Sequence, residues 1–142
     1  MDQDLKLLEE LGENAQMGIR TIDQLLTMVE DAPFREQLQR ELTFYKDFWE
    51  DVRRQLLDRG ADEQVFSRWE KMKTDVMLGM GTATDKSTSH IAEMLVLGST
   101  RGVIQLERDL HAYPNAGQEV IRLERHLLAG EEDNILRLRT FL

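Results

Sequence analysis

Apolar residues recur along this chain at alternating spacings of three and four, which is the period of a helix that buries one face. The clearest such row consists of Leu8, Leu11, Ala15, Gly18, Ile22, Leu25 and Val29. No stretch shows the strict alternation of apolar and polar residues that indicates a half-buried β-strand. The pattern therefore predicts an all-α protein.

Turn-forming residues divide the helical pattern into five expected helices. Pro33 and Pro114 both fall where the apolar period breaks, and Gly60 and Gly79 mark the ends of two further runs. The expected helices cover residues 2–30, 34–58, 62–80, 84–113 and 118–142. We expect them to form a single domain over residues 1–142, a length that can enclose a hydrophobic core.

The lengths of the connections predict how these helices pack. Short loops make the helices at 2–30 and 34–58 antiparallel neighbours, and the same holds for those at 84–113 and 118–142. About two dozen residues, including the expected helix at 62–80, join the two hairpins. This order predicts a four-helix bundle with one long crossover, and a five-helix up-and-down array is the alternative.

Composition and charge narrow the classes of partner and the location. The chain has 142 residues, no cysteine and a formal net charge of −9. The absence of cysteine excludes disulfides and thiolate metal ligands and suits a reducing cytoplasm. The negative charge argues against binding to a nucleic-acid backbone, and no apolar run reaches the roughly 20 residues of a membrane span. We therefore expect an acidic, cytoplasmic protein that binds no nucleic acid and has no transmembrane segment.

Two short segments resemble the metal-binding motifs of the ferritin-like superfamily. The sequence GEEDNI at 130–135 resembles the fourth-helix motif, and RELTF at 40–44 lies where the second-helix motif would be. The two-hairpin organisation is also similar to that of bacterial ferritin-like helical proteins. The resemblance implies a four-helix bundle whose iron-binding members use a Glu from each of two helices and a Glu-x-x-His pair from each of the other two.

Both histidines of that motif are missing from this chain. Phe44 stands three residues after Glu41, and Asn134 stands three residues after Glu131. We therefore expect no working di-iron site and no cofactor, and we lean against an enzyme. The leading hypothesis is a non-enzymatic interaction or structural protein.

The second hypothesis is a bundle that binds a metal, such as iron or manganese, or a small molecule through a non-standard set of side chains. Its candidate residues are Glu41, His90, Glu93, Glu131 and Asn134. His90 and Glu93 lie one turn apart on the same helix face, where they can ligate a metal or interact only with each other. A buried Asn134 can equally fix the register of the bundle. Ligand binding requires all five side chains to converge in one interior layer.

Small residues predict a close contact between two of the long helices. Gly12, Ala15 and Gly18 lie on the apolar face of the helix at 2–30, and Gly98 and Gly102 lie on that of the helix at 84–113. A glycine inside a helix costs about 1 kcal/mol relative to alanine, and close backbone packing can offset that cost. We expect this contact either within the chain or between two copies of a homodimer.

The expected helix at 62–80 carries an apolar, methionine-rich side. Its members are Trp69, Met72, Val76, Met77 and Met80. Methionine-rich faces adapt to varied partners, and amphipathic helices can lie on membrane surfaces. Two interpretations stay open, because this helix can cover one end of the bundle or project and bind a protein partner or a membrane surface.

Overall fold

The computed structural model describes residues 2–62, 64, 66–67 and 86–142, and α-helices account for most of them. Four α-helices are present in this part of the chain, and no strand occurs in it. They are α1 (Asp2–Leu26), α2 (Ala32–Asp58), α5 (Thr88–Ala112) and α6 (Gln118–Leu138), and a short 3₁₀ turn, η1 (Arg139–Phe141), follows α6. The all-α prediction is confirmed.

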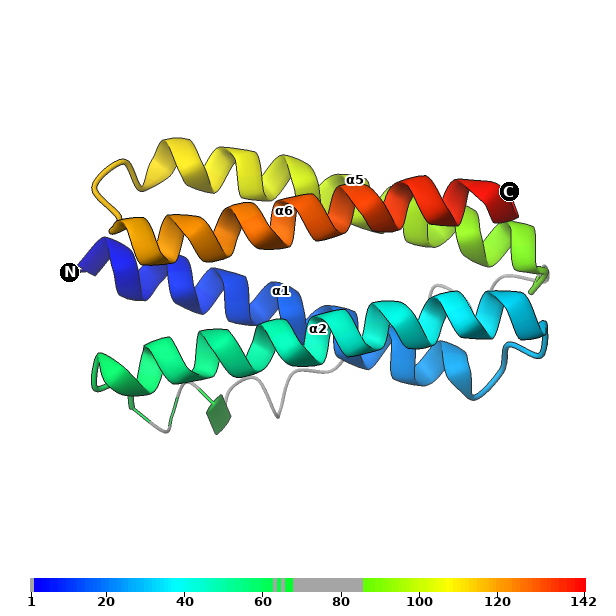
Figure 1. Ribbon diagram of the computed structural model, residues 1–142, viewed down its shortest axis with the longest axis horizontal. Helices are drawn as coiled ribbons and strands as arrows, with labels where there is room; N and C mark the ends of the chain where they lie inside the picture. The colour runs from blue at the N-terminus through cyan, green and yellow to red at the C-terminus, as the bar shows by residue number, and fades with distance from the viewer. Residues whose placement is uncertain (1, 63, 65, 68–85) are drawn as a thin grey trace.

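The four helices lie side by side along the long axis of the molecule as two hairpins (Figure 1). α1 packs along α2, α5 packs along α6, and α6 also contacts α1 and α2. α2 ends at one end of the bundle and α5 begins at the other, so residues 59–87 connect opposite ends (Figure 1). The prediction of a helical bundle is confirmed. Most of the helix expected at 62–80, including Trp69, Met72, Val76, Met77 and Met80, lies outside the described residues.

Local hydrogen bonds end α1 earlier than the apolar pattern predicts. α1 ends at Leu26 instead of residue 30, because the Arg35 guanidinium donates to the carbonyls of Leu26 at 2.6 Å and Val29 at 2.8 Å. The Asp31 side chain then accepts a hydrogen bond from the Phe34 N–H at 3.0 Å and caps α2. Pro33 occupies the first turn of α2, where its missing N–H costs nothing.

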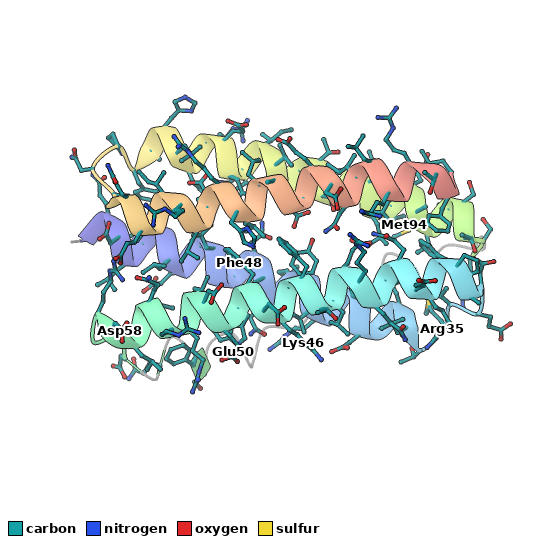
Figure 2. All side chains as sticks on the ribbon, in the orientation of Figure 1. Arg35, Lys46, Phe48, Glu50, Asp58 and Met94 are labelled. Atoms are coloured by element: carbon teal, nitrogen blue, oxygen red, sulfur yellow. The ribbon has the colours of Figure 1, made fainter. Side chains whose placement is uncertain are left out.

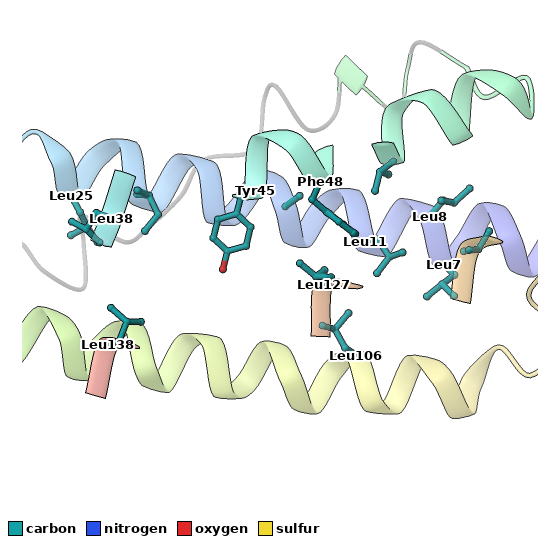
Figure 3. Packing of buried hydrophobic residues seen from close by; sticks show 14 of the residues in the cluster. Leu7, Leu8, Leu11, Leu25, Leu38, Tyr45, Phe48, Leu106, Leu127 and Leu138 are labelled. Atoms are coloured by element: carbon teal, nitrogen blue, oxygen red, sulfur yellow. The ribbon is translucent and has the colours of Figure 1, made fainter. Parts of the chain in front are cut away.

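Leucine and phenylalanine side chains fill the core between the hairpins (Figure 3). The row predicted from α1 is buried at Leu8, Leu11, Ala15, Ile22 and Leu25, with Val29 buried in the loop beyond. On α2, Phe48 points toward the other hairpin, whereas Lys46 and Glu50 point away from the bundle (Figure 2). Full burial of each large apolar side chain stabilises the fold by about 1.5–3 kcal/mol.

Two of the small residues lie against aromatic rings of α2. A Cβ atom on Gly18 would come within 2.7 Å of the Tyr45 ring, and a Cβ atom on Gly130 would overlap the ring of Phe44. Gly12 and Ala15 are buried as well. The small residues of α1 and α6 therefore make room for side chains of α2.

Candidate functional site

A pocket of about 760 Å³ lies between α1 and α5. Most of its lining comes from these two helices. The other two helices contribute Glu41 and Tyr45 of α2 and Glu131 of α6. Figure 3 shows the Tyr45 hydroxyl directed away from α2 into the space between the two hairpins. The pocket therefore combines side chains from all four helices.

The glycines of α5 line this pocket and do not pack against the backbone of α1. Among the described residues, no atom lies within 4 Å of a Cβ atom built on Gly98, and the nearest atom to one on Gly102 is Nδ2 of Asn14 at 3.5 Å. The predicted close contact of α1 and α5 within the chain is therefore wrong. The physical reason is that the Tyr45 ring, rather than the backbone of α5, occupies the space beside Gly18. A contact between two copies stays a prediction.

A cluster of buried polar side chains lies along the pocket beside Tyr45, and we call it the tyrosine cluster. It consists of Glu41, Tyr45 and Glu131, with Asn134 beside them, and none of these side chains is more than 5% exposed. The Tyr45 hydroxyl donates a hydrogen bond to Oε1 of Glu131 at 2.5 Å. Gln37 donates to Oε2 of Glu41 at 3.1 Å. Oε2 of Glu131 has no hydrogen-bond partner among the described residues.

Burial makes these carboxyl groups weak acids. It raises the pKa of Glu41 to about 8, an effect that the Gln37 hydrogen bond opposes and the Glu131 charge increases. Burial also raises the pKa of Glu131, although the Tyr45 and Ser99 hydroxyls favour its ionised form. At neutral pH the Glu41 side chain is therefore mostly uncharged, and a cation in the pocket would favour its ionisation.

Three further carboxyl groups converge at one end of the pocket, which we call the aspartate end. They belong to Glu10 of α1, Asp109 of α5 and Glu124 of α6, and Glu10 and Asp109 line the pocket itself. The Tyr113 hydroxyl donates to Oε1 of Glu10 at 2.8 Å, and Gln105 donates to Oδ1 of Asp109 at 2.9 Å. The second oxygen of Glu10 and both oxygens of Glu124 have no hydrogen-bond partner within the described part of the chain.

The acids of the aspartate end also bind protons more tightly than usual. Burial raises the pKa of Asp109 to about 7, and the neighbouring Glu10 carboxyl acts in the same direction. Burial raises the pKa of Glu124 to about 8, with the charges of Asp109 and Glu107 acting in the same direction. The tyrosine cluster and the aspartate end therefore both hold acids that lose their protons near neutral pH.

Sequence reasoning missed the aspartate end, although a signal was present. Glu124 is an acid within a row of buried residues that recur at helical spacing on α6, namely Val120, Glu124, Leu127, Glu131, Asn134 and Leu138. Asp109 interrupts the corresponding buried row of α5, three residues after Leu106. An acid at an apolar position of a helix was thus the signal that could have identified both residues.

The five predicted ligand residues do not converge in one layer. Glu41 and Glu131 line the pocket, and Asn134 lies beside Tyr45. His90 and Glu93 pair with each other instead, with Nδ1 and Oε2 3.7 Å apart and both side chains partly exposed, and neither lines the pocket. The prediction of a single five-residue site is therefore wrong, because the one-turn spacing of His90 and Glu93 satisfies them locally. Among the described residues, no three His, Cys, Asp or Glu side chains are grouped in a way that could hold a metal ion.

Comparisons with known proteins assign no family to this chain. Neither a protein-family model, nor a curated protein, nor a solved structure matches it. None of the described helices combines the length and the apolar character needed to cross a membrane.

Proposed function

We propose that this protein binds a small organic ligand in the pocket between α1 and α5, and that the ligand carries a protonated amine. The observation that supports this most directly is the carboxyl group of Glu131, which is 2% exposed, lines the pocket and has an oxygen without a partner among the described residues. A buried polar atom without a partner costs free energy, and a ligand that donates a hydrogen bond to it recovers that cost.

The size and the walls of the pocket support an organic ligand. Its volume of about 760 Å³ lies within the range of about 300–1,000 Å³ that is usual for small-molecule sites. Apolar side chains from both walls face the interior, among them Ile22 and Leu25 of α1 and Ile91 and Leu106 of α5. An apolar body with a few fixed polar contacts is the chemistry that such a pocket accommodates.

The charges around the pocket support a cationic ligand. Five carboxyl side chains line it, those of Glu10, Glu13, Glu41, Asp109 and Glu131, whereas Arg101 supplies the only positive charge among the described lining residues. An ammonium group next to a buried carboxylate offsets the cost of taking that charge out of water. The proposal concerns binding and keeps the expectation that the chain is not an enzyme.

Octylamine is a suitable probe, with octanol as the matched ligand that lacks the charge. We expect calorimetric titration to show octylamine binding at least tenfold more tightly than octanol. Glu131→Gln keeps the size of the side chain but removes its charge, so it should weaken octylamine binding about tenfold, or about 1.4 kcal/mol. Glu132→Gln, at an exposed neighbouring position of α6, should leave both affinities unchanged.

Two results would contradict this proposal. One is the failure of octylamine to bind to the wild-type protein. The other is equal affinity of the wild type and Glu131→Gln for octylamine, since the carboxylate would then make no contact with the amine. The melting temperature of each variant confirms that it is folded.

We further propose that the bundle is of the ferritin-like type, with its iron ligands replaced by structural residues. Two hairpins joined by a long connection support this relation. Phe44, which stands where the motif has a histidine, packs onto Gly130, and Asn134 lies beside Tyr45 in the polar cluster. Metal analysis of protein purified without a chelator tests this proposal, and stoichiometric iron or manganese would refute it.

A further inference from the structure

The lining of the pocket changes in character along the axis of the bundle. α1 and α5 run in opposite directions (Figure 1), and Gly102 of α5 lies beside Asn14 of α1. This pairing fixes the level of the other lining residues, so Gly98 is level with Gly18, against which the Tyr45 ring packs. The tyrosine cluster therefore lies in the middle of the pocket, between two sections of different chemistry.

The section on one side of the tyrosine cluster is mainly apolar. It extends toward the end of α1 and the start of α5, and its apolar lining residues are Ile22, Leu25, Ile91, Met94 and Leu95. Leu25 follows Gly18 by seven residues on α1, so this section extends about 10 Å from the cluster at about 1.5 Å per residue. It can hold an aliphatic chain of about that length.

The section on the other side, toward the aspartate end, is polar and carries the only positive charge among the described lining residues. Its polar members are Glu13, Asn14, Arg101 and Gln105. Arg101 forms no ion pair with any described residue. Asn14 and Gln105 add amide groups, which can donate hydrogen bonds. Glu13 is exposed, so water weakens the effect of its charge. This section therefore offers a guanidinium and amide donors to an anionic group.

The tyrosine cluster places a buried carboxyl acceptor between these two sections. Oε2 of Glu131 has no hydrogen-bond partner among the described residues, and the Glu131 side chain is 2% exposed. The Ser99 hydroxyl interacts with Glu131, which puts these two residues at the same level. Arg101 follows Ser99 by two residues, or about 3 Å along α5. A cation at Glu131 and an anion at Arg101 can therefore belong to one small polar group.

We propose that the ligand is an apolar α-amino acid, with its ammonium at Glu131, its carboxylate at Arg101 and its side chain in the apolar section. This inference rests on the proposed function and specifies the ligand class of the same site. One carbon atom of an α-amino acid carries all three groups, so the ammonium and the carboxylate reach neighbouring positions while the side chain extends away from them.

The charges of the pocket agree with a zwitterion. A simple amine would engage Glu131 and leave the guanidinium of Arg101 without a role. The planar guanidinium binds a carboxylate through two parallel hydrogen bonds, which gives both affinity and orientation. The ammonium of the same ligand satisfies the buried oxygen of Glu131. An amino acid therefore uses the acidic, the basic and the apolar parts of the lining together.

A matched set of ligands tests this inference on the full chain. 2-Aminononanoic acid is octylamine with a carboxyl group on the carbon that bears the nitrogen, so the two compounds differ only in that group. Calorimetric titration should show 2-aminononanoic acid binding about tenfold more tightly than octylamine, because a carboxylate on a guanidinium forms strong hydrogen bonds. Nonanoic acid, which lacks the amine, should also bind about tenfold more weakly than 2-aminononanoic acid.

A substitution at Arg101 tests the position of the carboxylate. Arg101→Gln removes the charge at an exposed position and leaves the core intact. It should lower the affinity for 2-aminononanoic acid to about that of octylamine, and it should not weaken octylamine binding. Arg108→Gln changes an exposed residue of the same helix that does not line the pocket, and this control should leave both affinities unchanged. Glu131→Gln should weaken both ligands, since both carry the ammonium.

The outcomes separate this inference from the proposed function. If octylamine binds and 2-aminononanoic acid binds no more tightly, the amino-acid ligand is refuted while the amine site stands. An unchanged affinity of Arg101→Gln for 2-aminononanoic acid would overturn the inference as well, because Arg101 would then not hold the carboxylate. If neither compound binds to the wild-type protein, both proposals fail.

Discussion

At the scale of single residues, the unusual feature of this protein is its buried carboxyl groups. Glu41 and Glu131 were predicted from their places in motif-like segments, and the structure buries both. Asp109 and Glu124 were not predicted, although they stand at buried positions of helical rows. Spacing along one helix shows that such a residue faces inward, but it cannot show which acids of other helices lie opposite. Their raised pKa values depend on those neighbours.

The pKa of Glu41 makes a prediction about stability. In the unfolded chain its pKa is close to 4.5, and in the folded protein it is about 8, so the folded state binds more protons between these values. The contribution of Glu41 to the free energy of unfolding is therefore fully present below pH 4.5 and is lost as pH rises through 8. Between these two pH values it decreases by about 1.4 kcal/mol per pH unit. Glu41→Gln has no proton to lose, so we expect it to be more stable than the wild type at pH 8.

Urea unfolding of both proteins at pH 5.5 and pH 8 measures this effect. The free energy of unfolding of Glu41→Gln should fall less between the two pH values than that of the wild type. Glu36→Gln, which changes an exposed acid of the same helix, should follow the wild type. A wild-type protein that gains stability toward pH 8 in step with Glu41→Gln would contradict the assignment.

At the scale of helices, the apolar period predicted where the elements lie, and local hydrogen bonds decided where they end. The period continues to residue 30, but Arg35 binds the carbonyls of Leu26 and Val29 and α1 stops at Leu26. The small residues illustrate the same limit. The spacing of glycines indicates a helix face without bulky side chains. Only the neighbouring helices determine whether a backbone or a ring packs against that face or whether it lines a pocket.

Two glycine substitutions separate these cases. Gly130→Ala places a Cβ atom into the Phe44 ring, so it should destabilise the protein by about 1–3 kcal/mol. Gly98→Ala meets no atom of the described residues within 4 Å, so it should stabilise α5 by up to about 1 kcal/mol through its higher helix propensity. Thermal unfolding at low protein concentration measures both changes.

The same pair of variants also bears on the predicted homodimer. If Gly98 packed against a second copy, Gly98→Ala would destabilise the protein and lower its mass in sedimentation at high concentration. A stabilised variant with unchanged mass would argue against a copy-to-copy contact at Gly98.

Phe44→Leu combined with Gly130→Ala should recover part of the stability that Gly130→Ala alone loses, because the smaller side chain at position 44 leaves room for the methyl group.

At the scale of the whole molecule, the proposed amine binding should be coupled to the release of protons. An ammonium group in the pocket favours the ionised form of Glu41 and Glu131, whose pKa values are raised in the free protein. Octylamine binding near pH 7 should therefore release protons, and its affinity should increase from pH 6 to pH 8. Calorimetry in buffers of different ionisation enthalpy counts the protons. Uptake of protons, or affinity that falls over this pH range, would contradict the coupling.

The sequence by itself determined the helical class, the approximate extent of four helices and the apolar rows that face the core, because these follow from a period of 3.6 residues within each helical segment. The tertiary structure alone decided that α1 and α5 enclose a pocket lined by acids from all four helices. The helical period states which face of each helix is turned inward. The distance between two such faces depends on the side chains that the other helices place there, and here the Tyr45 ring of α2 fills the space beside Gly18 while nothing fills the space beside Gly98 within the described part of the chain.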